Sequence, residues 1–195
     1  MNETIERQPT HYLLIDFEAT CADDGAVPRH QMEIIEIGAV MVDTASLAVI
    51  GEFQSFVRPV RHPRLTAFCT RLTSIAQADV DAAPGFAEAA AALKAWRGGY
   101  ADLVWGSWGD YDRNQLQQDC DFHRVPNPVG APHHNIKRLF AQREGSGRKF
   151  GLDGGVKRVR LDFAGTHHRG IDDARNIARL LPYALGRAEF PRAQR

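Results

Sequence analysis

The stretch that decides the fold is residues 11–20, His-Tyr-Leu-Leu-Ile-Asp-Phe-Glu-Ala-Thr. Its apolar run predicts a central β-strand that is buried on both faces. Side chains alternate between the faces of a strand, so Asp16 and Glu18 point the same way and Phe17 points the other. Two carboxylates at the end of a buried strand repel each other, and a divalent cation is the natural group to offset that repulsion. An isolated Asp-x-Glu would indicate only a solvated strand end, so this interpretation depends on residues further along the chain.

The composition is that of an ordinary globular protein. The chain has 195 residues, 44% of them hydrophobic, and its 24 basic and 24 acidic side chains give a formal net charge of zero. No global field therefore attracts a polyanion, which would have to be bound by local basic groups or by metal ions. The three cysteines form no CxxC pair, which argues against a zinc site, and their odd number argues against a full disulfide framework.

The organisation along the chain predicts one domain. We expect a flexible polar arm over residues 1–9, the domain over residues 10–186 and a tail over residues 187–195. The first ten residues lack the apolar region of a secretory signal, and no apolar run approaches membrane-spanning length. These features predict a cytoplasmic location and no membrane partner, whereas they make no prediction of oligomeric state.

Hydrophobic patterns and turn residues predict the other elements. After a first strand at residues 11–17, β-rich runs at residues 32–43 and 48–58 predict an antiparallel meander, and residues 101–107 predict a fourth strand. Pro84 is expected to open a long helix that ends before Gly98-Gly99. The helices are predicted at residues 65–70, 84–96, 112–123, 136–143, 150–159 and 171–185. Three strands followed by alternating helices and strands predict an α/β fold with a mixed sheet flanked by helices.

Further acidic residues and two histidines occur where elements are predicted to begin. The segment Gly-Asp-Tyr-Asp at residues 109–112 follows the fourth strand, at a strand-to-helix turn where ligands gather in such sheets. The segment His-His-Arg-Gly-Ile-Asp-Asp at residues 167–173 precedes the last helix. Two choices remain open on the residues alone: Asp110 or Asp112, and either His167 with Asp172 or His168 with Asp173. A capped helix with an exposed pair of histidines is the structural alternative.

Taken in order, these segments resemble a known enzyme family. The set Asp-Phe-Glu-Ala-Thr-Cys at 16–21, Gly-Asp-Tyr-Asp at 109–112 and His168-x4-Asp173 resembles the DEDDh family of 3′–5′ exonucleases. The closest branch trims RNA 3′ ends and includes the bacterial sporulation-kinase-pathway-inhibitor-like exonucleases. Supporting segments lie at residues 33–38, 68–73, 135–137 and 170–178, and the resemblance covers roughly residues 11–185. It implies an α/β, ribonuclease H-like fold, with a mixed five-stranded sheet flanked by helices.

The resemblance also implies a catalytic centre. Asp16, Glu18, Asp112 and Asp173 would hold two Mg²⁺ or Mn²⁺ ions, and His168 would be the general base. Hydrolysis of a phosphodiester needs an activated water and a stabilised leaving oxygen, which a pair of metal ions can provide, and a histidine can take a proton near neutral pH. The apolar Leu116 matches the family's pattern after Asp112. Asp110 is then expected to be a helix N-cap, and the five-residue step to Asp173 selects His168.

A further set of residues are candidates for nucleic-acid binding. Phe17 could stack on the terminal base, although a core aromatic on the opposite face of the strand is an equal alternative. Arg148 and Lys149 belong to a basic stretch that could follow phosphates, and a solvated loop is the alternative. Ala19 and Thr20 complete the set because they adjoin the first carboxylates.

The sequence therefore favours a metal-dependent 3′–5′ exonuclease that acts on the 3′ ends of single-stranded RNA or DNA and releases nucleoside 5′-monophosphates. RNA and DNA are not distinguished, because no motif specifies contacts to the 2′-hydroxyl. One alternative is a nucleic-acid- or protein-binding regulatory module whose activity is incidental. Another is a proofreading exonuclease of a DNA polymerase, which would share the chemistry.

Overall fold

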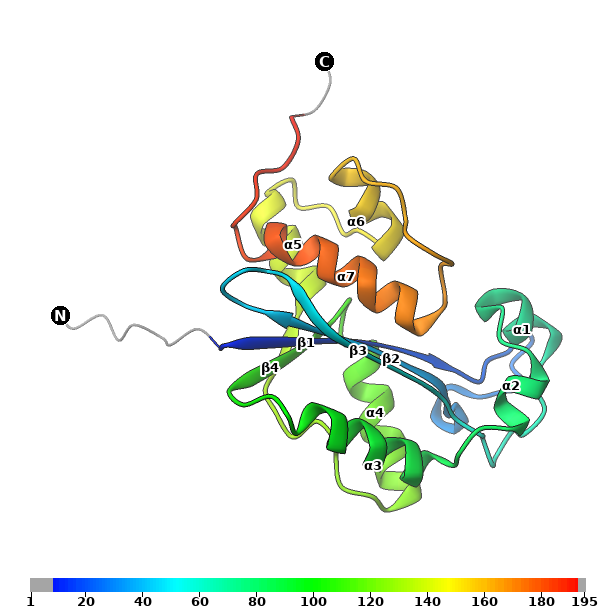
Figure 1. Ribbon diagram of the computed structural model, residues 1–195. Coiled ribbons are helices and arrows are strands. Elements are labelled where there is room, and N and C mark those ends of the chain that lie inside the picture. The colour runs from blue at the N-terminus through cyan, green and yellow to red at the C-terminus, as the bar shows by residue number, and fades with distance from the viewer. Residues whose placement is uncertain (1–8, 193–195) are drawn as a thin grey trace.

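The computed structural model describes residues 9–192 and consists of one sheet covered by helices on both faces (Figure 1). The strands are β1 (His11–Ala19), β2 (Ile34–Asp43), β3 (Val49–Phe56), β4 (Leu103–Ser107) and β5 (His133–Asn135). The helices are the 3-10 helix η1 (Arg29–Gln31) and the α-helices α1 (Ala67–Thr73), α2 (Gln77–Asp81), α3 (Phe86–Arg97), α4 (Tyr111–His123), α5 (Ile136–Glu144), α6 (Leu152–Arg158) and α7 (Gly170–Ala184).

The sheet is mixed and has β1 at its centre. The strand order is β3-β2-β1-β4-β5. The pairs β1–β2 and β2–β3 are antiparallel, whereas β1–β4 and β4–β5 are parallel. Because β1 and β4 are parallel neighbours, their carboxyl ends lie at the same edge of the sheet, and the chain leaves β4 there to begin α4. This topology is the predicted ribonuclease H-like architecture.

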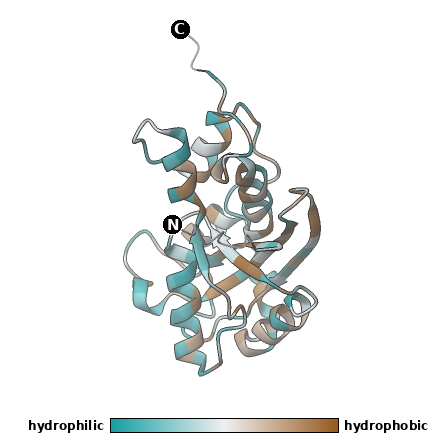
Figure 2. Cartoon of the chain, turned by 90° about the vertical axis from the view of Figure 1, so that its left-hand side faces the viewer, coloured by the Kyte–Doolittle hydropathy of each residue, from teal (hydrophilic) through white to brown (hydrophobic). Residues whose placement is uncertain are grey.

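Two hydrophobic clusters flank the sheet and reflect the alternation along β1. Tyr12 and Leu14 pack with β2 residues and with α5, α6 and α7 on one face. Leu13, Ile15 and Phe17 pack with α3 and α4 on the other. Figure 2 shows hydrophobic residues along the strands and hydrophilic residues on outward helix surfaces. Asp16 and Glu18 continue the Tyr12–Leu14 face, so both carboxylates point the same way, as predicted, and that side is the one covered by α7.

Most predicted elements are confirmed, with four corrections. Strand β5 and helix α2 were not predicted from the residues, and α1 begins at Ala67 and ends at Thr73. The expectation that Pro84 opens α3 is wrong, because the helix begins at Phe86 with Gly85 as its N-cap. The carbonyl of Pro84 instead accepts a hydrogen bond of 2.9 Å from the amide of Arg58, which ties this segment to the chain after β3.

The ends of the predicted domain are described only in part. The predicted N-terminal arm falls on residues 1–9, of which all but Pro9 lie outside the described residues. In the predicted C-terminal tail, the Phe190 ring lies 5.0 Å from the ring of Phe140, measured between centroids. Over residues 9–192, no helix is long and apolar enough to cross a membrane.

Candidate active site

The carboxylates of β1 lie beside the start of α7. In the β1–β2 ladder, Asp16 pairs with Gly38 and Glu18 pairs with Glu36. A Cβ atom on Gly38 would lie only 2.0 Å from the carbonyl carbon of Gly170, so the absence of a side chain lets the first residue of α7 rest directly on β2. This close approach brings Asp173, in the first turn of α7, next to the carboxylates of β1.

Three acidic side chains meet at this point. One carboxylate oxygen from each of Asp16, Glu18 and Asp173 lies within 4.8 Å of the others. Glu18 is 8% exposed and Asp173 is 4% exposed. Asp16 and Glu18 come from β1 and Asp173 from α7, so the fold assembles the cluster from two segments that are distant in sequence.

Asp112 joins the same cavity from the start of α4. Its Oδ1 atom accepts a hydrogen bond of 3.0 Å from the amide of Phe17, between the two carboxylates of β1, and its side chain is 4% exposed. Asp110 faces elsewhere, since its carboxylate accepts from the Asn135 amide at 2.9 Å and lies 3.2 Å from Arg138. Asp110 is the N-cap residue of α4, as predicted, although its side chain makes no capping hydrogen bond.

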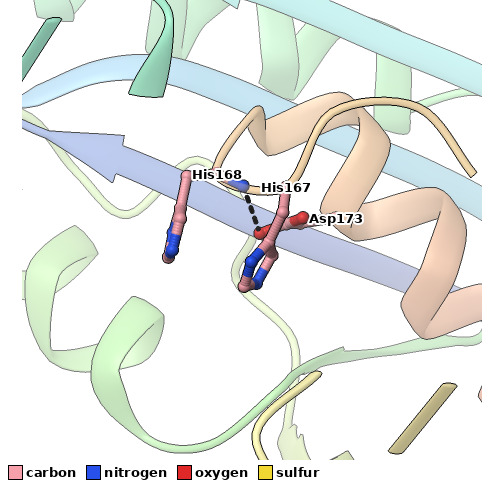
Figure 3. Close-up of side chains that lie close together, drawn as sticks. All are labelled: His167, His168 and Asp173. Atoms are coloured by element: carbon pink, nitrogen blue, oxygen red, sulfur yellow. Dashed lines mark hydrogen bonds between the residues drawn. The ribbon is translucent and has the colours of Figure 1, made fainter. Parts of the chain in front are cut away.

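The two histidines before α7 differ in their surroundings. His168 lines the cavity with the carboxylates, and its amide donates to Asp173 Oδ2 at 3.3 Å (Figure 3). His167 is exposed and stacks on the His168 ring at a centroid distance of 4.0 Å. Asp172, the alternative partner, accepts from Arg175 at 2.9 Å and from the amide of Thr166. The structure therefore brings His168 and Asp173 into the cavity and holds Asp172 outside it.

His168 has an unusual backbone. Its φ angle is +64°, in the left-handed region that residues with side chains seldom adopt. Such strain persists only where surrounding contacts impose it, and it gathers at functional sites. Here the bond from the His168 amide to Asp173 and the start of α7 at Gly170 fix the conformation.

Burial and mutual repulsion dominate the electrostatics of the acidic residues. Burial, followed by the charges of Asp112, Glu18 and Asp173, raises the pKa of Asp16 well above its usual value. Burial and the Asp173 charge raise the pKa of Glu18 to about 9. Burial likewise raises the pKa of Asp112 to about 6 and that of Asp173 to about 7. Without cations, the folded chain therefore resists ionising these carboxyl groups together.

The arrangement fits divalent cations. Asp173 Oδ1 is buried and, within residues 9–192, has no hydrogen-bond partner. A buried acceptor without a partner is costly, and a cation at that oxygen would remove the cost. Clustered carboxylate oxygens are the ligands that Mg²⁺ and Mn²⁺ prefer. Asp16, Glu18 and Asp173 would share one region of the cavity, with Asp112 at its side.

The cavity has a volume of about 290 Å³ and contains apolar residues that the sequence analysis did not select. Its remaining walls include Met32, Leu72, Trp108, Tyr111 and Leu152. Tyr111 is 41% exposed and is the first residue of α4, directly before Asp112. Its position next to Asp112 was the feature of the sequence that could have identified it as a cavity residue. Apolar and aromatic walls beside a polar centre are typical of ligand pockets.

The residues predicted to contact nucleic acid differ in their burial and in whether they line the cavity. The Phe17 side chain is 3% exposed and packs in the cluster beneath α3 and α4, as the core alternative expects, and Phe17 also lines the cavity. Ala19 lines the cavity. Thr20 is 2% exposed, and its hydroxyl oxygen accepts from the Glu33 amide at 3.0 Å. Arg148 and Lys149 are exposed in the loop that leads to Leu152 on the cavity wall.

Comparisons with known proteins identify a family and relatives to which this chain is similar. A family model described as exonuclease matches residues 13–181. Human ERI1 exoribonuclease 2 is 30% identical over 87% of this chain and 28% of its own length. Mouse ERI1 exoribonuclease 3 is 33% identical over 88% of this chain and 52% of its own length. The chain thus spans about half or less of these two curated relatives.

A solved structure of an exonuclease is also similar to this chain. The crystal structure of the nuclease domain of 3′hExo, a DEDDh family member bound to rAMP, is 27% identical and has a TM-score of 0.84. The match covers 95% of this chain and 98% of that one. The chain therefore belongs to the exonuclease family.

Proposed function

We propose that this chain is a metal-dependent 3′–5′ exonuclease that removes nucleoside 5′-monophosphates from the 3′ ends of single-stranded RNA. The observation that carries the proposal is the unpartnered, buried Asp173 Oδ1 in a cavity that also contains Asp16, Glu18, Asp112 and His168. A ligand pocket with several buried carboxylates at its centre is suited to phosphodiester hydrolysis assisted by metal ions.

Asp16, Glu18, Asp112 and Asp173 would hold two Mg²⁺ or Mn²⁺ ions. Such ions, when bound, polarise the phosphate and stabilise the attacking and leaving oxygens. Burial, followed by the charge of His167, lowers the pKa of His168, so its imidazole is neutral near pH 7 and can accept a proton from the attacking water. The amide of His168 restrains Asp173 Oδ2, which leaves Oδ1 directed at a ligand.

RNA is the proposed substrate class because the two curated relatives are named exoribonucleases and the nuclease domain of 3′hExo was solved with rAMP. The cavity is small and is bounded by Trp108 and Tyr111, which suits a single terminal nucleotide rather than a duplex. A DNA substrate remains an outcome of the test below.

The test uses 5′-labelled single-stranded RNA and DNA of the same sequence, with Mg²⁺ or Mn²⁺, and resolves the products by length. We expect RNA to shorten stepwise from its 3′ end, no shortening with a chelator, and no shortening when the 3′ hydroxyl is replaced by phosphate. No shortening of either strand with either metal would refute the proposal.

A matched pair of variants separates the site from its neighbours. Asp173→Asn should lower kcat by at least about a thousandfold, because it removes a carboxylate expected to hold a metal ion. Asp172→Asn changes the adjacent carboxylate, which is bonded to Arg175 outside the cavity, and should retain most activity. Equal losses in the two variants would mean that the start of α7 has only a structural role.

A further inference from the structure

Arg29 lies at the rim of the active-site cavity, on the short helix η1. Its guanidinium carbon is 4.5 Å from the centroid of the Tyr111 ring, and Tyr111 lines the cavity directly before Asp112. Stacking of a guanidinium on an aromatic face leaves its N–H groups available around the edge. Arg29 is exposed, so solvent or a ligand can reach those groups.

The position of Arg29 is set by a buried amide. Its Nη1 atom donates to Oε1 of Gln115, a residue on α4 that is 0% exposed. The orientation of Gln115 is itself fixed, because its Nε2 atom donates to the carbonyl of Met32 at 2.9 Å and to Asp119 Oδ2 at 2.6 Å. Gln115 Oε1 must therefore point toward Arg29. The arginine is held in place at two points, by the Tyr111 ring and by Gln115.

The guanidinium of Arg29 forms no ion pair in the described part of the chain, although its charge acts on the nearby Asp112 carboxyl. Within residues 9–192, no carboxylate lies within ion-pair distance of its guanidinium, whereas the nearby Arg113 and Arg138 both pair with Asp110. A guanidinium carries five N–H donors, and one of them is used by Gln115. An immobilised, unpaired and exposed cation beside a cavity for phosphodiester hydrolysis is suited to an anionic oxygen of the substrate.

We propose that Arg29 binds a phosphate of the substrate strand at the cavity rim, next to the phosphate that is cleaved. The inference rests on the proposed exonuclease function and assigns it a substrate-binding residue. The cleaved phosphate would lie among the carboxylates that would hold the metal ions, and the strand would leave the cavity past Tyr111, which lines it. Arg29 there binds the next phosphate by its remaining N–H groups while its guanidinium stays stacked on the Tyr111 ring.

The experiment compares two substrates that differ in whether this second phosphate exists. One is a single-stranded RNA of ten nucleotides, and the other is the p-nitrophenyl ester of uridine 5′-monophosphate, which contains only the phosphate to be cleaved. For Arg29→Ala, the ratio of kcat/KM on RNA to kcat/KM on the ester should fall about tenfold, mainly through KM on RNA, as expected for one charge-assisted hydrogen bond. The slope of log KM against log salt should decrease by about one unit of charge.

Arg29→Lys and Arg113→Ala complete the design. Arg29→Lys keeps the charge but loses the planar fork, so it should restore the salt slope and only part of the selectivity for RNA. Arg113→Ala also removes one positive charge, from the first turn of α4 next to Asp112. Because Arg113 is paired with Asp110, this variant should change the substrate ratio less than about twofold. Thermal melts confirm that each variant is folded.

Two results would overturn the inference: an unchanged substrate ratio in Arg29→Ala, which includes equal losses on RNA and on the ester, or the same fall in this ratio in Arg113→Ala. These results are distinct from failure of the proposed function, because in that case the wild-type chain would hydrolyse neither substrate.

Discussion

Glu36 on β2 forms a buried ion pair with Arg169, the residue immediately before α7. The Arg169 Nε atom lies 3.1 Å from Glu36 Oε2, and the same oxygen accepts from the Gly170 amide at 3.0 Å. The Glu36 Oε1 atom accepts from Gln54 at 2.6 Å. Glu36 is 0% exposed, so the donors that surround it occupy both of its oxygens. Its role is to fasten the segment that carries His168 and Asp173 to the sheet.

Replacing Glu36 with Gln should weaken both stability and activity. An amide cannot accept from all of these donors, and it leaves the Arg169 guanidinium, which is 24% exposed, without its counter-charge. We expect a loss of about 2–3 kcal/mol in the free energy of unfolding and a fall of about 5–10 °C in Tm. Displacement of the start of α7 should lower kcat by about tenfold or more. Thermal melts and steady-state kinetics on RNA measure the two effects.

Glu52→Gln is the matched control. Glu52 pairs with Arg175 on the same helix at 2.6 Å, but both side chains are well exposed, at 39% and 43%. Exposed pairs contribute little, so the control should lose less than about 1 kcal/mol and retain its kcat. If Glu36→Gln behaves like Glu52→Gln, the buried pair does not position the catalytic segment.

Gly38→Ala tests the contact between β2 and α7. The added Cβ would meet the Gly170 carbonyl carbon at 2.0 Å, and backbone atoms cannot rotate away as a side chain could. We expect destabilisation of about 3 kcal/mol or more, and a loss of about a hundredfold in kcat because Asp173 moves relative to Asp16. Gly154→Ala is the control, since its nearest neighbour would be 3.9 Å away. That variant should gain about 0.5–1 kcal/mol from its higher helix propensity. Normal turnover in Gly38→Ala would contradict the packing argument.

The strand alternation and the ordered motifs were enough to predict the sheet, the common face of Asp16 and Glu18, and the segments that form the cavity. These features depend on local sequence periods and on the resemblance. Strand β5 was missed because its three residues, His-His-Asn, have no apolar pattern and are defined by pairing with β4, where His133 lies opposite Trp105. The Arg169–Glu36 pair joins residues 133 positions apart, and no local pattern encodes such a contact.

Asp112 and Asp110 should differ sharply in their effect on activity. Asp112 lines the cavity and is bonded to the Phe17 amide, whereas Asp110 pairs with Arg138 and bonds to Asn135 outside it. Asp112→Asn should lower kcat by at least about a thousandfold, and Asp110→Asn by less than about fivefold. The same kinetic assay on RNA measures both, with thermal melts to exclude unfolding. A larger loss in Asp110→Asn would reverse the assignment.

His133 should make stability depend on acid pH. Burial, followed by the Arg113 charge, lowers its pKa from 6.5 to about 4, and its Nε2 atom lies 2.9 Å from Ser107 Oγ. Because the folded chain disfavours the protonated ring, this contribution to stability is present above about pH 6.5 and is lost as the pH falls through about 4. Allowing for partial solvent access, it should amount to about 1 kcal/mol between pH 7 and pH 5.

The measurement is the difference in Tm between pH 7 and pH 5 for the wild-type chain and for His133→Asn. The variant should lose less stability on acidification, by about 2–4 °C in Tm. His30→Asn changes an exposed histidine on η1 and should follow the wild type. An identical acid dependence in the wild-type chain and His133→Asn would show that other groups cause it.

Glu18→Gln should stabilise the metal-free chain while it removes metal binding. Burial and the charges of Asp173, Glu36 and Asp112 raise the pKa of Glu18 to about 9. A carboxyl whose pKa is higher in the folded state contributes stability below its unfolded value of about 4.5, and this is lost as the pH rises through about 9. At pH 8, Glu18 therefore opposes folding unless cations are bound. A neutral amide should raise Tm in chelator by about 3–8 °C, which corresponds to about 1–3 kcal/mol.

Addition of 10 mM Mg²⁺ should reverse the order of the two proteins. Binding to the folded state stabilises the wild-type chain by RT ln(1 + [Mg²⁺]/Kd), whereas Glu18→Gln lacks one of the ligands and should respond much less. Glu88→Gln, an exposed carboxylate on α3, should change Tm little in either condition. A lower Tm for Glu18→Gln in chelator would mean that the protein itself already compensates the clustered charges. In that case, the argument that this cluster requires cations would fail.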